Sequence, residues 1–206
     1  MKRLLIIFTA LLMFATTMSA GEKLTIRDIT GSKFSAKMVN GMNPISGTDT
    51  YARIEGKKIV SYSFKTGKQV SVLFDADNTI GKKIDGFDSY IFSPDGKRML
   101  IQTKTEKIYR RSYKAEFYIY NIASRRLDPL SDGGPQQVPT WSNDGLQVAF
   151  VRDNNIFLVK LLYDNAEIQV TKDGKFNEVI NGLPDWVNEE EFGFNRALTF
   201  NADGTM

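Results

Sequence analysis

The fold is decided by a stretch that occurs twice, first as Phe92-Ser93-Pro94-Asp95-Gly96-Lys97-Arg98-Met99-Leu100-Ile101 and again as Trp141-Ser142-Asn143-Asp144-Gly145-Leu146-Gln147-Val148-Ala149-Phe150. Both copies follow the pattern aromatic, Ser, any residue, Asp-Gly, any two residues and three apolar residues, and they begin 49 residues apart. A period near 50 residues with about four strands per repeat is typical of the blades of a β-propeller. Two Asp-Gly turns that occur by chance in a β-sandwich are the alternative interpretation.

Weaker copies of the pattern lie further out along the chain. A third begins at Phe200-Asn201-Ala202-Asp203-Gly204, and a blurred one lies at Ile45-Ser46-Gly47-Thr48-Asp49. Residues 21–206 hold fewer than four blades of this length, whereas a closed propeller needs about four to eight. Because the third copy stops before its apolar strand, we expect the chain to be a piece of a longer protein.

Between these copies the sequence predicts short strands joined by tight turns. Apolar or alternating runs typical of strands occupy residues 58–64, 69–74, 98–102, 116–120 and 147–151. Asx-Gly or Thr-Gly pairs separate these runs, and glycine permits the positive φ that tight turns need. No stretch after residue 20 keeps an apolar period of 3.6 residues for three turns. The sequence therefore predicts an all-β fold.

The composition excludes most familiar enzyme chemistry. The 206 residues are 42% hydrophobic and 25% charged, as is usual for a globular protein, but they include no His and no Cys. A Ser-His-Asp triad, a zinc site with nitrogen or sulfur ligands, a haem His and a disulfide are therefore impossible. The run Asp153-Asn154-Asn155 lacks the Gly and the distal Glu of a calcium loop. We expect no catalytic residue, no metal site and no cofactor in this chain.

The first 20 residues predict export. Lys2 and Arg3 precede an apolar run over residues 4–15, and small residues follow up to Ala20. This order is typical of a secretory signal peptide, here residues 1–20, and an uncleaved membrane anchor is the alternative. We therefore expect a secreted or periplasmic protein whose propeller region covers residues 21–206. Without Lys2 and Arg3 the formal charge falls from +3 to +1, so we expect no nucleic-acid partner.

One segment departs from the strand pattern, Asp185-Trp186-Val187-Asn188-Glu189-Glu190-Glu191-Phe192. Asp185 follows Pro184 and predicts a helix N-cap, so that the three glutamates lie on a helix of one or two turns. Adjacent carboxylates repel each other, and a cation is expected where they converge. An α-ammonium group suits such a place, because two carboxylates can accept its three N–H donors. A solvated acidic turn is the alternative.

This segment resembles the double-glutamate segment of dipeptidyl peptidase IV, in the prolyl oligopeptidase family of serine exopeptidases. Two further stretches, Ile108-Tyr109-Arg110-Arg111-Ser112-Tyr113-Lys114-Ala115 and Val151-Arg152-Asp153-Asn154-Asn155-Ile156-Phe157, are similar to the same family's propeller in the same order. The resemblance covers most of residues 25–204, with bacterial secreted members nearest. It implies an eight-bladed propeller beside an α/β-hydrolase domain. Of that propeller, this chain would supply about three to four blades and the short helical insertion that carries the double-Glu motif.

The resemblance also implies an activity and substrate-binding residues. The family removes Xaa-Pro or Xaa-Ala dipeptides from peptide N-termini. Glu190 and Glu191, the last two of the triplet, would bind the ammonium group of the peptide N-terminus, and Arg110 would bind a substrate carbonyl beside them. Glu189 points elsewhere on a helix that turns by about 100° per residue. We therefore expect Glu189→Gln to be milder than the same change at its two neighbours.

The chain also departs from this family. Asn188 stands where the family usually has Tyr, and Arg111 stands where it often has His. No Gly-x-Ser-x-Gly motif is present, so the hydrolase domain is absent and we expect the chain alone to be inactive. Family members are often homodimers. A non-catalytic interaction module derived from a propeller is the alternative function.

Overall fold

The computed structural model describes residues 23–36 and 41–204. The chain divides into two compact units, Met1–Val39 and Asn40–Met206. The expected signal peptide, residues 1–20, lies outside the described residues. In the two described ranges, no helix is long and apolar enough to cross a membrane.

The described part of the first unit contains a short helix, α2 (Ile26–Thr30). A capping box begins this helix: the backbone N–H of Asp28 donates to Thr25 Oγ1 at 3.2 Å, and the backbone N–H of Thr25 donates to Asp28 Oδ2 at 2.9 Å. The sequence analysis does not anticipate α2, because five residues are too few to display a 3.6-residue period.

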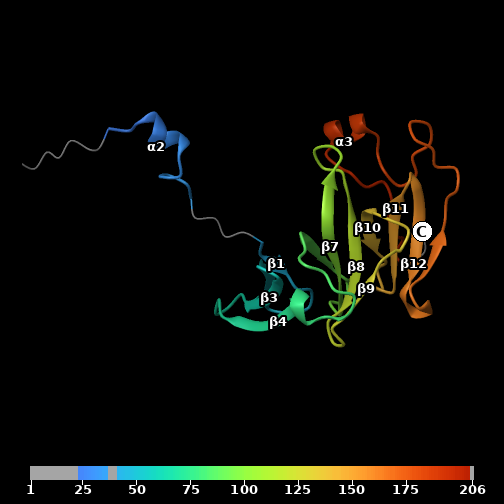
Figure 1. Ribbon diagram of the computed structural model, residues 1–206, viewed down its shortest axis with the longest axis horizontal. Coiled ribbons are helices and arrows are strands. Elements are labelled where there is room, and N and C mark those ends of the chain that lie inside the picture. Colours follow the sequence, from blue (N-terminus) through green and yellow to red (C-terminus); the bar gives the residue numbers. More distant parts are fainter. Residues whose placement is uncertain (1–22, 37–40, 205–206) are drawn as a thin grey trace, which may run out of the picture. The chain divides into compact units, whose positions relative to one another are not determined.

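The second unit contains three sheets that follow one another along the chain (Figure 1). The first sheet consists of β1 (Asn43–Pro44), β2 (Thr50–Glu55), β3 (Lys58–Ser63) and β4 (Gln69–Asp75). The second consists of β6 (Ser89–Phe92), β7 (Arg98–Lys107), β8 (Tyr113–Asn121) and β9 (Arg126–Pro129), with β5 (Ile80–Gly81) parallel to β9. The third consists of β10 (Gln137–Trp141), β11 (Gln147–Arg152), β12 (Asn155–Lys160) and β13 (Ala166–Gln169).

Each of these sheets contains four strands that pair antiparallel with their neighbours in sequence, and the second sheet has the short β5 as a fifth strand. This is the structure of a propeller blade, and the three sheets are named blade 1, blade 2 and blade 3 in chain order. Two short 3₁₀ helices, η1 (Ala76–Asn78) and η2 (Leu161–Tyr163), follow β4 and β12. The prediction of an all-β, partial propeller fold is confirmed.

The repeated Ser-x-Asp-Gly stretch closes the hairpin between the first two strands of blade 2. Ser93 Oγ donates to Asp95 Oδ1 at 2.6 Å and accepts from the backbone N–H of Arg98 at 2.9 Å. Gly96 has a φ of +67°, a backbone conformation that is unfavourable for residues with a Cβ atom. The turn therefore needs the serine and the aspartate for their hydrogen bonds, and it needs the glycine for its positive φ.

Blade 3 repeats this turn with the same contacts. Ser142 Oγ donates to Asp144 Oδ1 at 2.5 Å and accepts from the backbone N–H of Gln147 at 2.9 Å, while Gly145 has a φ of +69°. In the third copy the N–H of Gly204 donates to the carbonyl of Asn201 at 3.1 Å, as the N–H groups of Gly96 and Gly145 donate to the carbonyls of Ser93 and Ser142 at 2.9 Å. The repeat is thus structural as well as sequential, since its first two copies make the same hairpin and the third makes the same turn hydrogen bond.

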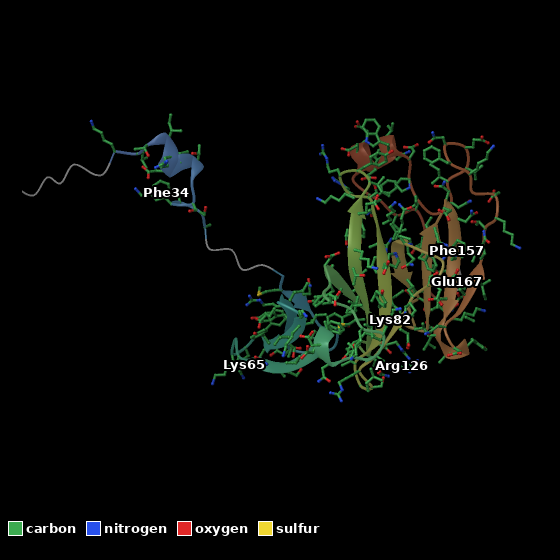
Figure 2. All side chains as sticks on the ribbon, viewed as in Figure 1. Phe34, Lys65, Lys82, Arg126, Phe157 and Glu167 are labelled. Carbon is green, nitrogen blue, oxygen red and sulfur yellow. The ribbon has the colours of Figure 1, made fainter. Side chains whose placement is uncertain are left out.

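Side chains of blade 2 pack against both neighbouring blades. In β7, Met99 and Ile101 belong to the cluster shared with blade 1, whereas Leu100 between them belongs to the cluster shared with blade 3. A strand buried on both faces must be apolar at consecutive positions, which explains the uninterrupted apolar run of β7. The buried residues of the second cluster are Leu100, Ala115, Phe117, Ile119, Leu130, Trp141, Val148, Phe150, Phe157 and Val159, of which Figure 2 labels Phe157.

Candidate functional site

The predicted helix after Pro184 is α3 (Trp186–Phe192), seven residues long. Asp185 is its N-cap as predicted, and its Oδ1 accepts the backbone N–H of Asn188 at 2.7 Å. Gly193 ends the helix with a φ of +75°, and its N–H donates to the carbonyl of Glu189 at 3.0 Å. The caps at both ends fix which side of this short helix each glutamate occupies.

A long hairpin in blade 2 reaches the same end of the unit as α3 (Figure 1). Its strands are β7 and β8, and the connecting residues 108–112 form a loop in which the N–H of Ile108 donates to the carbonyl of Ser112 at 3.0 Å. Arg110 lies at the tip of this loop. The topology therefore brings Arg110 to the acidic helix, although the two segments are almost 80 residues apart in sequence.

Glu189 joins the helix to this loop. The backbone N–H groups of Arg111 and Ser112 both donate to Glu189 Oε1, at 2.7 and 2.9 Å. Glu189 is only 3% exposed. Burial alone would raise the pKa of Glu189, but hydrogen bonds from the Arg111–Ser112 segment and the charge of Arg111 outweigh it, and the pKa lies below its ordinary value. The buried carboxylate is therefore charged, and its Oε1 atom accepts two backbone hydrogen bonds.

Glu190 faces Arg110. Arg110 Nε lies 3.2 Å from Glu190 Oε2, and the side chains are 71% and 20% exposed, respectively. Glu191 is exposed, and within the described ranges it has no hydrogen bond or ion pair. The structure therefore brings two of the predicted residues, Arg110 and Glu190, into contact and places the third, Glu191, beside them on the open side of the helix.

The two positions that depart from the family both have contacts here. Asn188 Nδ2 donates to both carboxylate oxygens of Asp185 at 3.1 Å and so reinforces the N-cap. Arg111 packs over Gly193, where a Cβ would lie 3.3 Å from its Nη2. The carbonyl of Arg111 accepts from Asn195 Nδ2 at 2.9 Å. Asn188 therefore fits the N-terminal cap of the helix, and Arg111 fits the contact between the loop and the segment that contains α3.

A hollow of about 390 Å³ lies beside this contact, and Ser112 and Glu189 are among its lining residues. Segments far apart in sequence line it, namely the hairpin loop, the turn between β11 and β12, and the stretch that leads into α3. Trp186 lines the hollow and is 56% exposed. Arg110, Glu190 and Glu191 are not part of the lining, so the ion pair lies outside the hollow.

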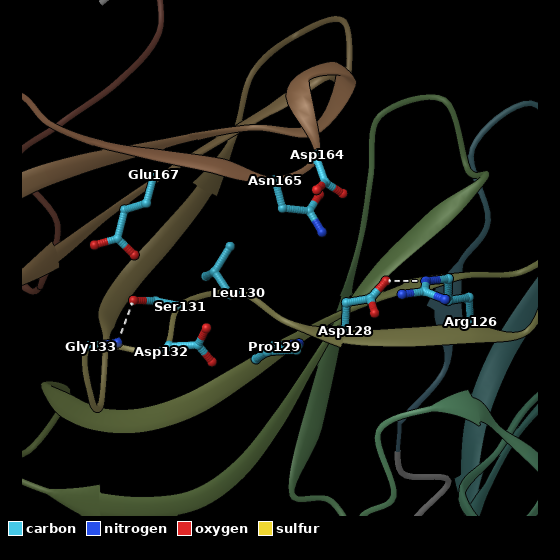
Figure 3. A pocket seen from close by; sticks show the side chains of 10 residues that line it. All are labelled: Arg126, Asp128, Pro129, Leu130, Ser131, Asp132, Gly133, Asp164, Asn165 and Glu167. Atoms are coloured by element: carbon cyan, nitrogen blue, oxygen red, sulfur yellow. Dashed lines mark hydrogen bonds and ion pairs between the residues drawn. The ribbon is translucent and has the colours of Figure 1, made fainter.

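A second hollow, of about 560 Å³, lies away from α3, near β9 and β13 (Figure 3). Two of its acidic side chains are neutralised by arginine: Asp128 Oδ2 lies 2.8 Å from Arg126 Nε, and Glu167 Oε1 lies 2.7 Å from Arg152 Nη2. The sequence analysis singled out no residue here. Its chemistry is that of surface ion pairs, and it offers no second candidate site.

Three four-stranded blades joined by a repeated turn, with a helix and a loop at one end, define a protein of the β-propeller class. Within this class, the profile of the family described as "Dipeptidyl peptidase IV (DPP IV) N-terminal region" matches residues 93–206, more than half of the chain. The chain belongs to this family.

Individual relatives agree with this assignment. Prolyl endopeptidase FAP of Bos taurus is 33% identical over 174 residues, which are 84% of this chain and 22% of the relative. A probable dipeptidyl-aminopeptidase B of Tuber melanosporum is 31% identical over 91% of this chain and 23% of its own length. The crystal structure of Porphyromonas gingivalis dipeptidyl peptidase 4 superimposes with a TM-score of 0.80 at 36% identity, covering 89% of this chain and 26% of that chain. The chain thus spans about a quarter of the length of these relatives.

Proposed function

We propose that this chain supplies the substrate-recognition region of a dipeptidyl peptidase IV-like serine exopeptidase, which removes Xaa-Pro or Xaa-Ala dipeptides from peptide N-termini. In this proposal Glu190 and Glu191 bind the α-ammonium group of the peptide, and Arg110 binds a substrate carbonyl. The observation that carries it is the contact of 3.2 Å between Arg110 Nε and Glu190 Oε2, two residues from distant segments.

The charges at this contact suit a peptide N-terminus. Arg110 occupies one oxygen of Glu190 through Nε, and the other oxygen and the exposed carboxylate of Glu191 can accept from an ammonium group. The Arg110 side chain is 71% exposed, so its terminal Nη groups can donate to a carbonyl. A peptide held at both its ammonium group and this carbonyl has a fixed position in the site.

That fixed position would act as a ruler. Two carboxylates that hold the N-terminus place the bond after the second residue at a constant distance, which a nucleophile in a hydrolase domain can then attack. The 206 residues include no His, so we propose that this chemistry is done by a hydrolase domain joined to the region, as in the relatives. Residues 1–20 support export of the protein to the periplasm or the medium.

A chimaera tests the proposal. The corresponding region of Porphyromonas gingivalis dipeptidyl peptidase 4, which is 36% identical, is replaced by residues 41–204 of this chain, and kcat/KM is measured on an Xaa-Pro substrate. A charge-assisted hydrogen bond is worth about 1.5–3 kcal/mol, so Glu190→Gln and Glu191→Gln should each lower kcat/KM by about 10- to 150-fold. Glu106→Gln is the matched control, because this exposed glutamate lies on the same hairpin in a surface ion pair. Losses no larger than that of the control would refute the proposal.

A further inference from the structure

The three consecutive glutamates of α3 differ in their surroundings. Glu189 is buried, Glu190 is partly exposed and Glu191 is exposed. The only hydrogen-bonded contacts described for the Glu189 side chain are with the loop and not with the solvent-facing side of the helix. Glu189 Oε1 therefore cannot bind a ligand held by the two neighbouring glutamates without giving up these contacts.

We propose that Glu189 is a positioning residue that holds the loop of residues 108–112 against α3 and so keeps Arg110 beside Glu190. The effect on substrate rests on the function proposed above, whereas the effect on the loop does not. The hydrogen-bonded residues are direct neighbours of the ion-paired ones: Arg111 follows Arg110 in the loop, and Glu190 follows Glu189 in the helix. The hydrogen bond between Arg111 and Glu189 thus restricts the distance between Arg110 and Glu190.

Two further contacts hold the same loop residue. The carbonyl of Arg111 accepts from Asn195 Nδ2 at 2.9 Å, and its guanidinium packs over Gly193. Both the N–H and the C=O of Arg111 are therefore bound by the segment that contains α3. This leaves little freedom for the backbone immediately after Arg110, whereas the Arg110 side chain is exposed apart from its ion pair with Glu190 and can meet a ligand.

The role requires an acceptor and not specifically a negative charge. Both N–H groups donate to one oxygen, Glu189 Oε1, and the side-chain carbonyl of Gln has two lone pairs that can accept both. Ala has no acceptor and would leave two backbone N–H groups unpaired in a buried place. Glu190 is different, because its proposed role depends on its charge. The inference therefore predicts that Gln replaces Glu at position 189 but not at position 190.

Hydrogen exchange of the full chain tests the effect on the loop. We expect the amides of Arg111 and Ser112 to exchange at least about tenfold faster in Glu189→Ala than in the parent, and within about threefold of the parent in Glu189→Gln. Glu191→Ala is the control for a change on the same helix and should leave both amides protected. Unchanged protection in Glu189→Ala would overturn the inference, as would equal losses in the Ala and Gln variants.

Kinetics of the chimaera test the effect on substrate. Glu189→Ala should lower kcat/KM for a free-amine Xaa-Pro substrate by about tenfold or more, and Glu189→Gln should restore it to within about threefold. Reaction of the catalytic serine with a fluorophosphonate should be the same in both variants, because that reaction does not require the N-terminal site. Full activity of Glu189→Ala, in a chimaera that Glu190→Gln inactivates, would overturn the inference but not the proposed function. If Glu190→Gln is also without effect, the proposed function fails, and hydrogen exchange alone decides the positioning role.

Discussion

Replacement of Ser142 by Ala should remove a large part of the stability of the propeller unit. Ser142 is fully buried, and its Oγ donates to Asp144 Oδ1 at 2.5 Å and accepts from the N–H of Gln147 at 2.9 Å. A hydrogen bond to a carboxylate is worth about 1.5–3 kcal/mol and a neutral one about 0.5–1.5 kcal/mol. Since Ala removes both, we expect the free energy of unfolding to fall by about 2–4 kcal/mol, a large share of the total for a domain.

Equilibrium unfolding of the full chain in urea, followed by tryptophan fluorescence, measures this loss. Ser124→Ala is the matched control, because Ser124 is exposed and a surface change of this kind stays within about 0.5 kcal/mol. A loss below about 0.5 kcal/mol for Ser142→Ala at an unchanged m-value would refute the conclusion that the repeated turn stabilises the blades.

Three other predictions concern the same unit. The hydrogen bond from Ser142 is the largest cause that lowers the pKa of Asp144 in the folded protein. The charged Asp144 therefore stabilises the fold fully above the pKa that it has in the unfolded chain, and this stabilisation is lost as the pH falls through the pKa of the folded state. Asp144→Asn should reduce the difference between the urea midpoints measured at about pH 6 and pH 3. Gly193→Ala should destabilise by about 1–2 kcal/mol in the same assay, because its φ is +75°. Phe117→Ala should lose about 3–5 kcal/mol because Phe117 is 1% exposed, whereas Phe176→Ala, at 80% exposed, should lose far less.

Most of the strands predicted from the sequence contain consecutive buried residues, whereas β4 is predicted from its apolar run although only Phe74 in it is buried. The apolar runs of β7 and β11 extend over consecutive buried residues and stand out in the sequence. All four residues of β13 are exposed, so β13 carries no apolar pattern. The short β9 has a single buried residue, Leu127. β9 and β13 are held largely by hydrogen bonds to the neighbouring strand, and this contribution leaves no signal in the sequence.

The candidate site, too, could be predicted from the sequence only in part. Asp185 as an N-cap follows from local sequence alone, whereas Arg110 is singled out only through the resemblance to a family, and the structure places it in contact with Glu190. The three glutamates are identical as residue types, however, and helical spacing indicates only that Glu189 points in another direction. Its burial depends on a loop 77 residues away in sequence. The expectation that Glu189→Gln is mild is retained for another reason, since Gln can accept the same two hydrogen bonds.

The ratio of kcat/KM for a free-amine Xaa-Pro substrate to that for its N-acetylated form, in the parent chimaera and in Glu190→Gln, tests the central claim most directly. Acetylation removes the positive charge that Glu190 is proposed to bind, and the substitution removes the negative one, so the two changes are not independent. We predict a ratio that falls by about tenfold or more from the parent to Glu190→Gln, because the variant no longer distinguishes an ammonium group from an amide. The same ratio in both proteins would show that Glu190 does not bind the peptide N-terminus.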